Sequence, residues 1–234
     1  MKQKHKESLD DVVKSISQGR ERTNFLRRYE QKALAYLVQV IPSWISSDML
    51  TAIGLGGSVL VFLAFVLSVT VGKAWLLLGL AGFFISWFGD SLDGRIAYYR
   101  NRPRKWYGFS LDITVDWLGI ILMGLGFVFY APGWWKMIGF VFVVLYGWEM
   151  ITALLRYKVT GNYSIDSGIF GPTEVRLLIS AILLLEVILQ GSILYTASLA
   201  CLLLLIFNLI DFKKILRLAD ARDREEKANK TGNG

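Results

Sequence analysis

The sequence offers almost no nitrogen or sulfur ligands for a metal, because its 234 residues include one histidine and one cysteine. His5 lies in a charged N-terminal segment, where we expect it to be solvated and inert. Cys201 lies inside a long apolar run, where a cysteine is most simply a small packing residue. These absences exclude a disulfide within the chain, catalysis by histidine and a histidine-rich metal site.

Charge is also missing from three long stretches, which cover residues 49–72, 117–135 and 187–210. Uncharged apolar runs of about 20 residues are typical of membrane-spanning helices. Hydrophobic residues make up 54% of the whole chain, which is too apolar for an ordinary soluble domain of this length. We therefore predict an all-α integral membrane protein without a second domain.

The apolar runs predict six transmembrane helices, although one run is long enough to be mistaken for a single helix. Residues 177–210 carry one charge, Glu186, but Gln190-Gly191-Ser192 favours a tight turn that divides the run. The spans are expected at about 49–71, 74–98, 110–131, 134–155, 174–190 and 193–212. The chain is thus divided into a polar tail (1–22), a juxtamembrane helix (23–44), a six-span domain (45–212) and a basic, mobile tail (213–234).

The juxtamembrane segment, 23–44, has the pattern of an amphipathic helix. Its charged residues lie mostly off one apolar stripe, and Pro42 ends the pattern before the first span. We expect this helix to lie on the membrane surface. The predicted stripe consists of Leu26, Tyr29, Ala33, Tyr36, Leu37 and Val40.

Basic residues predict the orientation of the chain in the membrane. With six spans, all Lys and Arg residues except Lys73 and Lys136 fall on one side, and this side is expected to be cytoplasmic. Both termini and the loop after the second span would then face the cytoplasm. The net charge of +7 favours contact with anionic lipid headgroups. No nucleic-acid partner is expected, because no motif that reads nucleic acid accompanies the charge.

Four aspartates stand where two predicted spans meet water. Asp90 and Asp93 end the second span, and Asp112 and Asp116 begin the third. Spacings of three and four residues place each pair on one helical face, and the short basic loop predicts that the two helices pack as antiparallel neighbours. Four converging carboxylates would repel one another, and oxygen ligands of this kind favour Mg²⁺ or Mn²⁺.

A purely structural interpretation of the aspartates is that they form ion pairs with nearby arginines. Ionisable groups embedded in membrane spans are costly, however, and usually mark function. Two pairs at helical spacing on consecutive helices favour a metal site. The candidate ion-pair partners are Arg95, Arg100, Arg102 and Arg104.

These positions resemble the motif of the CDP-alcohol phosphotransferase family, D-x2-D-G-x2-A-R-x8-G-x3-D-x3-D. The chain departs from it in two respects: Tyr98 stands where the family has arginine, and the following gap is one residue longer. Arg95 and Arg100 are candidates to supply the missing cation. The matching residues are Asp90, Asp93, Gly94, Ala97, Gly108, Asp112 and Asp116.

The resemblance implies a reaction in which the hydroxyl of an acceptor alcohol attacks the β-phosphorus of a CDP-alcohol, and CMP leaves. It implies two divalent ions, Mg²⁺ or Mn²⁺, with Asp90, Asp93 and Asp112 as principal ligands. Asp116 would complete the site and act as general base. The resemblance also implies the architecture of an interfacial helix followed by six spans, and a homodimer.

Further residues are candidates for binding the nucleotide. Gly94 and Ala97 are small enough to let a ligand approach the helix backbone, and the resemblance adds Gly108. The stretch SSDMLTAIG opens the first span where the family often has a nucleotide contact, which indicates Asp48 and Thr51. The alternative is that Ser47 or Asp48 caps the helix, and both roles are compatible.

The segment between the fourth and fifth spans carries Arg156 and Lys158, and Arg176 opens the fifth span. These cations are candidates for an acceptor or phosphate pocket, which would favour a phosphorylated or otherwise polar alcohol. The alternative is that each extends to lipid headgroups. Inside the spans, we expect Glu149, Glu186 and Asn208 to form interhelical hydrogen bonds.

The sequence thus predicts an enzyme of phospholipid biosynthesis, with CDP-diacylglycerol as the expected donor and a small polar alcohol as acceptor. Two other functions are open: a small cation transporter, and a non-catalytic membrane scaffold that uses the aspartates as an ion site. No acidic path continues across the membrane, which argues against the transporter.

Overall fold

The computed structural model describes residues 12–13, 27–161 and 172–232. The predicted polar tail lies almost wholly outside them, as do positions 23–26 of the predicted juxtamembrane helix. Within the described ranges the chain forms helices and no strands. These are α2 (Arg27–Val40), α3 (Ser47–Thr70), η1 (Lys73–Leu76), α4 (Leu77–Tyr99), α5 (Lys105–Tyr130), η2 (Gly133–Trp135), α6 (Lys136–Thr160), α7 (Pro172–Ile188) and α8 (Ser192–Gly232).

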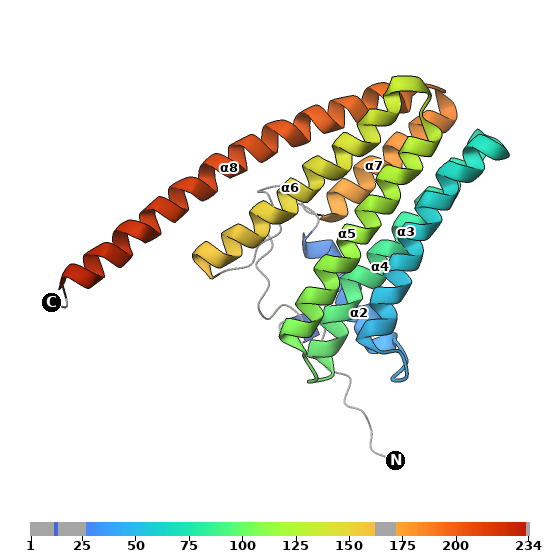
Figure 1. Ribbon diagram of the computed structural model, residues 1–234. Helices are drawn as coiled ribbons and strands as arrows, with labels where there is room; N and C mark the ends of the chain where they lie inside the picture. The colour runs from blue at the N-terminus through green and yellow to red at the C-terminus, as the bar shows by residue number, and fades with distance from the viewer. Residues whose placement is uncertain (1–11, 14–26, 162–171, 233–234) are drawn as a thin grey trace, which may run out of the picture.

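Five of these helical segments are long and apolar enough to cross a membrane: Ser47–Thr70, Lys73–Tyr99, Lys105–Tyr130, Gly133–Thr160 and Ser192–Asn229. The long helices run up and down one bundle (Figure 1). With 17 residues, α7 is shorter than the other long helices. At 1.5 Å per residue it is about 25 Å long, at the low end of what a bilayer core of about 30 Å requires.

The two ends of the bundle are distinct in Figure 1. We call the end that holds α2 and the α4–α5 connection the α2 end. The α3–α4, α5–α6 and α7–α8 connections lie at the opposite end. The predicted break at Gln190-Gly191-Ser192 is confirmed, because α7 ends at Ile188 and α8 begins at Ser192. Gly191 has φ 91°, a conformation that glycine adopts without strain.

The α2 helix is apolar on two sides. Leu34, Ala35 and Val38 are buried against α3 and α4 in one core cluster. Tyr36 and Val40, which belong to the predicted stripe, are exposed on another side of the helix. The helix docks on the protein through the buried residues and through Leu37, which does belong to the predicted stripe, whereas Tyr36 and Val40 are left for another apolar surface.

Glycines allow α3 and α4 to touch backbone to backbone. A Cβ on Gly57 would lie 2.4 Å from the backbone nitrogen of Ser86, and one on Gly89 would lie 2.4 Å from that of Gly54. The next residue on α3, Ser58, faces α5 instead, since a Cβ on Gly119 would lie 2.8 Å from its hydroxyl. Neighbouring positions of α3 thus contact α4 on one side and α5 on the other.

The predicted direct packing of the helices that carry the aspartates is wrong. Both α4 and α5 pack mainly on α3, and they make few contacts with each other. The physical reason is the small-residue surface of α3, which lets it lie closer to each of them than they lie to one another.

The α8 helix does not end with its apolar stretch. It runs through the predicted C-terminal tail to Gly232, a length of 41 residues. Within the predicted tail, Arg222 donates hydrogen bonds of 2.8 Å to the carbonyls of Lys158 and Val159. This contact satisfies two carbonyls in the last turn of α6, which lack partners within that helix.

Candidate metal and substrate site

Three of the four predicted aspartates meet at the α2 end of the bundle. Asp90 on α4 and Asp112 and Asp116 on α5 each offer a carboxylate oxygen, and these oxygens lie within 4.8 Å of one another. All three residues are half-buried. We call this group the aspartate cluster. It forms where α4 and α5, both held by α3, face each other without packing closely.

The aspartate cluster fits a hard divalent cation. Mg²⁺ binds oxygens at about 2.1 Å, so two oxygens on one ion lie at most about 4.2 Å apart. The observed separations of up to 4.8 Å come within this range after small rotations of the side chains. The ligands are carboxylate oxygens without nitrogen or sulfur, which favours Mg²⁺ or Mn²⁺ over zinc or copper.

Arg176 of α7 lies among these carboxylates. Its Nη1 donates to Asp90 Oδ2 at 2.7 Å, and its Nη2 lies 3.9 Å from Asp116 Oδ1. The guanidinium therefore bridges α4 and α5 from a third helix. Sequence reasoning placed Arg176 in an acceptor pocket, and the structure places it directly on two of the predicted metal ligands.

Asp93 lies apart from the aspartate cluster and is nearly inaccessible. Its Oδ2 accepts a hydrogen bond of 2.7 Å from the Thr51 hydroxyl, and its Oδ1 accepts one from the backbone N–H of Gly94. Ser47 Oγ donates to the Asp93 carbonyl at 2.8 Å. The close contact of α3 with α4 brings these groups together, so α3 fixes the orientation of the Asp93 carboxylate.

The start of α3 has a different cap from the predicted one. Ser46, rather than Ser47 or Asp48, is the N-cap, and its hydroxyl accepts from the Met49 N–H at 3.1 Å. Asp48 is partly exposed and forms a salt bridge with Arg104 of the α4–α5 connection. Ser46, Ser47 and Asp48 follow one another, and each can accept a hydrogen bond from a backbone N–H. The sequence alone therefore did not determine which of them caps the helix.

The remaining candidates for the nucleotide site differ in their surroundings. Gly108 is exposed, and a Cβ there would have no neighbour within 4 Å, so there is open space beside it. Gly94 and Ala97 are half-buried on α4. Arg95 is buried and donates to the Ser91 carbonyl, while Arg100 donates to the carbonyls of Ile41, Pro42 and Ile45. Arg100 thus ties the α2–α3 link to the end of α4.

The other two acceptor candidates do not join the aspartate cluster through any contact described here. Arg156 Nη2 binds Asp211 Oδ2 of α8 at 2.9 Å, and Lys214 binds the other oxygen of Asp211 at 3.1 Å. The Lys158 side chain is exposed. Arg156 therefore has a structural partner that the sequence did not reveal, because Asp211 follows it by more than fifty residues.

Tyr146 of α6 is a neighbour of the aspartate cluster that sequence reasoning missed. Its side chain lies within electrostatic range of Asp116, Asp90 and Arg176, and of Glu149 on its own helix. The chain has ten tyrosines, and nothing in the sequence around Tyr146 marked it as a neighbour of the aspartates. It became visible only because α6 packs beside α5.

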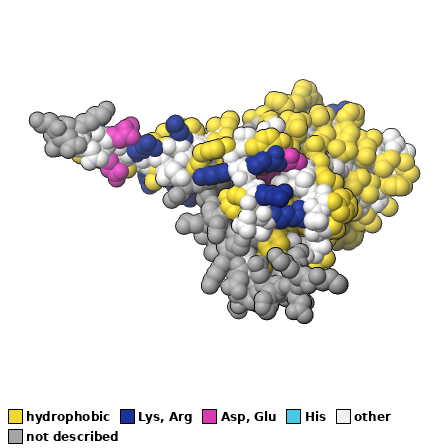
Figure 2. Space-filling view, turned by 90° about the horizontal axis from the view of Figure 1, so that it is seen from below, with side chains coloured by type: hydrophobic (Ala, Val, Ile, Leu, Met, Phe, Trp, Pro, Cys, Tyr) yellow, Lys and Arg dark blue, Asp and Glu magenta, His cyan; other side chains and the backbone are white. Residues whose placement is uncertain are grey.

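Seen from the α2 end, several Lys and Arg side chains lie beside a small area of acidic side chains (Figure 2). Apolar side chains form the flanks of the molecule in the same view. Basic side chains beside half-buried carboxylates suit a ligand that carries both phosphates and a bound cation.

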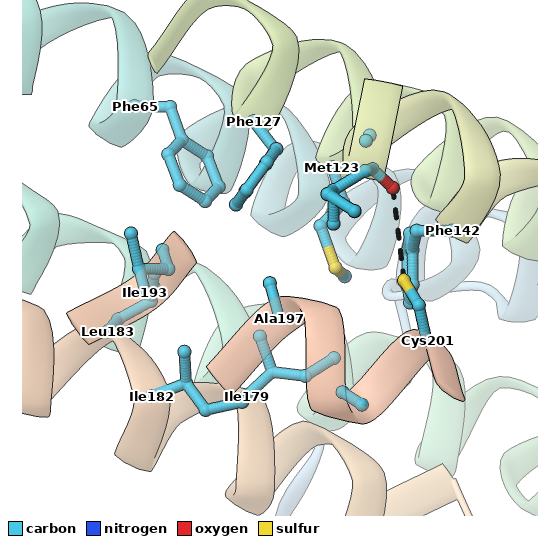
Figure 3. A pocket seen from close by; sticks show the side chains of 14 residues that line it. Phe65, Met123, Phe127, Phe142, Ile179, Ile182, Leu183, Ile193, Ala197 and Cys201 are labelled. Carbon is cyan, nitrogen blue, oxygen red and sulfur yellow. Dashed lines mark hydrogen bonds between the residues drawn. The ribbon is translucent and has the colours of Figure 1, made fainter. Parts of the chain in front are cut away.

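The bundle also contains an apolar cavity of about 70 Å³ between α5, α6, α7 and α8 (Figure 3). Phe65, Met123 and Phe127 line one side of it, and Cys201 lies at one end with its thiol near the Ile138 carbonyl. All lining side chains are apolar apart from this thiol, so the cavity offers nothing to a nucleotide or an ion. Cys201 is a packing residue, as expected.

A model of the CDP-alcohol phosphatidyltransferase family matches residues 44–207. The match includes α3 to α7, the first part of α8 up to residue 207, and all four predicted aspartates. No curated protein gives a significant match to the sequence.

Proposed function

The chain belongs to the CDP-alcohol phosphatidyltransferase family, and from this premise we propose that it transfers a phosphatidyl group from CDP-diacylglycerol to a small polar alcohol. This family is one of phosphotransferases that act in phospholipid headgroup transfer, so the chain is an enzyme. The observation that carries the specific proposal is the aspartate cluster. Its three carboxylates converge beside an arginine at one end of a membrane bundle, where a lipid and a water-soluble substrate can meet.

The reaction joins the acceptor oxygen to the β-phosphorus and breaks the bond between that phosphorus and the oxygen of CMP. Asp116 receives the proton of the acceptor hydroxyl. Its side chain is 40% accessible, compared with 23% for that of Asp90. An accessible carboxylate can approach an incoming hydroxyl, and position matters more than basicity here.

Asp90 and Asp112 are the ligands that would hold one or two divalent cations, together with Asp116. Asp93 joins them in the proposal through the family resemblance, with Thr51 orienting its carboxylate. Bound cations would offset negative charge on the pyrophosphate and on the departing CMP. The chain itself contributes alignment, because three helices fix the carboxylates relative to one another.

The nucleotide would lie against the start of α3 and the α4–α5 connection. Asp48 and Thr51 lie on the first two turns of α3, and the space beside Gly108 is open. Gly94 and Ala97 permit close approach to α4. Because Thr51 already binds Asp93, its proposed contribution to nucleotide binding is indirect, through the position of that carboxylate.

The acceptor is proposed to be a phosphorylated or polar alcohol, because Arg176 of α7 stands beside the aspartate cluster and Arg156 and Lys158 lie near the end of α6. Arg176 is the strongest candidate to contact it, since it already lies beside Asp116. Lys158 is exposed and remains available, whereas Arg156 is bound to Asp211. We therefore place Arg156 at the edge of the pocket.

In the membrane, we propose that α7 is the sixth span and that the stripe of α2 lies at the lipid interface. Five spans of sufficient length and a 17-residue α7 at their side support six crossings. The asymmetry of Lys and Arg supports a cytoplasmic α2 end, with both termini and the site on that side. A homodimer is proposed from the family resemblance.

The test is release of CMP by the purified protein in mixed lipid and detergent micelles. CDP-diacylglycerol and Mg²⁺ would be supplied with glycerol 3-phosphate, inositol, inositol phosphate or serine in turn. We expect release with one acceptor, its loss on adding EDTA, and its recovery with excess Mg²⁺ or Mn²⁺. The Asp112→Asn protein, run beside the wild type, should show no release above background.

Two outcomes would contradict the proposal in different ways. If the folded protein binds CDP-diacylglycerol but releases no CMP with any acceptor, then the donor or the acceptor has been misassigned. If it neither binds the donor nor releases CMP, then the aspartate cluster does not serve this reaction.

A further inference from the structure

We propose that Arg176 is an internal counter-cation that competes with the divalent cation for the aspartate cluster, so that metal binding displaces its guanidinium. This inference rests on the proposed function, because it concerns the ion of the same site. It assigns to Arg176 a role toward the ligand-free cluster in addition to any contact with substrate.

The first support is the geometry of the ion pairs. Arg176 makes a 2.7 Å hydrogen bond to Asp90 and stands 3.9 Å from Asp116, so it spans two of the three carboxylates. Only 17% of its side chain is accessible, and 23% of that of Asp90, so water screens this pair little. The charges of Asp90 and Asp116 both stabilise the guanidinium.

The second support is electrostatic. Three carboxylates with oxygens within 4.8 Å of one another repel, and a cation among them lowers this repulsion. A guanidinium that bridges Asp90 and Asp116 stands within a few ångströms of the place where an ion bound to the same oxygens must lie. Two cations so close together repel, so each weakens the binding of the other.

The consequence follows from linkage, which requires this effect to be reciprocal. Metal binding must weaken the contact of Arg176 with Asp90, and removal of the guanidinium must strengthen metal binding. Arg176 thus keeps the cluster intact when no metal is bound. Since it lies on the second turn of α7, its release also loosens a link between α7 and α4.

The experiment measures Mn²⁺ affinity by the electron paramagnetic resonance signal of free Mn²⁺, for purified full-length protein in detergent. We expect Arg176→Gln to bind Mn²⁺ more tightly than the wild type by about 5- to 150-fold, the usual range for coupling between two ligands. Arg176→Lys keeps the charge but cannot bridge two carboxylates as a planar fork does. Its affinity should also rise, by a smaller factor.

The chain offers a matched control in the Arg156–Asp211 pair. Arg156 is an arginine that binds a buried aspartate at 2.9 Å, and the same 17% of its side chain is accessible. Arg156→Gln removes the same charge from the same end of the protein. Its Mn²⁺ affinity should equal that of the wild type, because its carboxylate partner is outside the aspartate cluster.

Thermal unfolding in EDTA and in Mn²⁺ provides the second measurement. Arg176→Gln should be destabilised in EDTA and should recover in Mn²⁺ by a larger shift in melting temperature than the wild type. Arg156→Gln should be destabilised equally in both conditions. An Arg176→Gln protein that folds only with Mn²⁺ present would support the proposal strongly, since the ion would then substitute for the guanidinium.

The contrary outcomes separate this inference from the proposed function. If the wild type binds Mn²⁺ and releases CMP while Arg176→Gln binds Mn²⁺ equally or more weakly, the counter-cation role alone is overturned. If Arg176→Gln does not fold in either condition, an unchanged Mn²⁺ affinity of Arg176→Lys overturns it. If no protein binds Mn²⁺ and the wild type releases no CMP, both proposals fail.

Discussion

The two ends of the bundle each hold carboxylates that are at least half-buried, but the partners of these carboxylates differ. At the α2 end, three carboxylates face one another, with Arg176 between two of them. At the opposite end, Glu186 is alone and only 1% accessible. Four donors surround its two oxygens: the Tyr130 hydroxyl, the Gly191 N–H at 2.9 Å, the Ser192 hydroxyl at 3.3 Å and the Ile193 N–H at 2.8 Å.

The difference separates a structural carboxylate from a functional one. Glu186 accepts from backbone N–H groups at the start of α8, so it caps that helix and closes the α7–α8 turn. Lys73 extends the group by donating to Tyr130 at 2.6 Å, which adds the α3–α4 connection. The expected interhelical role of Glu186 is thus confirmed. In the aspartate cluster, by contrast, like charges are held together, an arrangement that a bound cation stabilises.

The largest expected effect is on turnover, when Asp116 is changed to asparagine. The side chain keeps its shape but can no longer take the proton of the acceptor. General-base contributions of this kind are about 10²- to 10⁴-fold, and we expect CMP release to fall by that factor. The melting temperature in EDTA should stay the same or rise, because one negative charge leaves the cluster. A large fall in stability would show that Asp116 is structural, like Glu186.

The complementary change is Glu186→Ala, which should reduce stability and spare turnover. It leaves the Tyr130 hydroxyl and two backbone N–H groups buried without an acceptor, at about 1–3 kcal/mol each. For a chain of this size, each kcal/mol lowers the melting temperature by about 2–4 °C. The three groups together cost about 3–9 kcal/mol, so we expect a fall of roughly 6–36 °C in detergent. CMP release per folded molecule should remain near that of the wild type. A loss of turnover without a loss of stability would show that Glu186 is not merely structural.

The third prediction concerns the α3–α4 contact that supports the aspartate cluster. A Cβ at Gly89 would lie 2.4 Å from backbone atoms of α3, which cannot move aside as a flexible side chain can. We expect Gly89→Ala to cost about 1–3 kcal/mol of stability and to reduce turnover, because Asp90 and Asp93 shift with α4. Gly56→Ala is the matched control, since a Cβ there has no neighbour within 4 Å. Equal effects of the two substitutions would contradict the close contact.

The sequence predicted the aspartates of the site better than their partners. Helical periodicity is a local property, so the spacings placed Asp90 with Asp93 and Asp112 with Asp116 on one face each. The convergence of all four was inferred from the short connection, and the structure brings together Asp90, Asp112 and Asp116. Arg176 could not be placed on Asp90 from the sequence, since 86 positions separate them and only the packing of α7 on α4 brings them together. The same limit applies to Asp211, which binds Arg156 across the α6–α8 contact.

The fold shows where local pattern reasoning succeeds and where it does not. The break before Ser192 was predicted because glycine and polar residues interrupt an apolar run. The direct packing of the two aspartate-bearing helices was predicted from their short connection and is wrong. The small residues on α3 decide how these two helices pack. Gly57 faces α4, and the next residue, Ser58, faces α5. Such a choice between partners depends on surfaces that come together only in the folded protein.

The smallest predicted effect decides between two roles of Thr51, the orientation of Asp93 and a direct contact with the nucleotide. If the Thr51 hydroxyl orients Asp93 as a metal ligand, Thr51→Val should raise the Mg²⁺ concentration for half-maximal CMP release by about 10- to 100-fold. The KM for CDP-diacylglycerol should then change little. Thr51→Ser keeps the hydroxyl that donates to Asp93 at 2.7 Å and should restore the wild-type requirement for Mg²⁺. The opposite pattern is a raised KM for the donor at an unchanged Mg²⁺ requirement, and it would make Thr51 a direct nucleotide contact. Asp93 would then be a structural carboxylate held by α3, as Glu186 is held at the other end of the bundle.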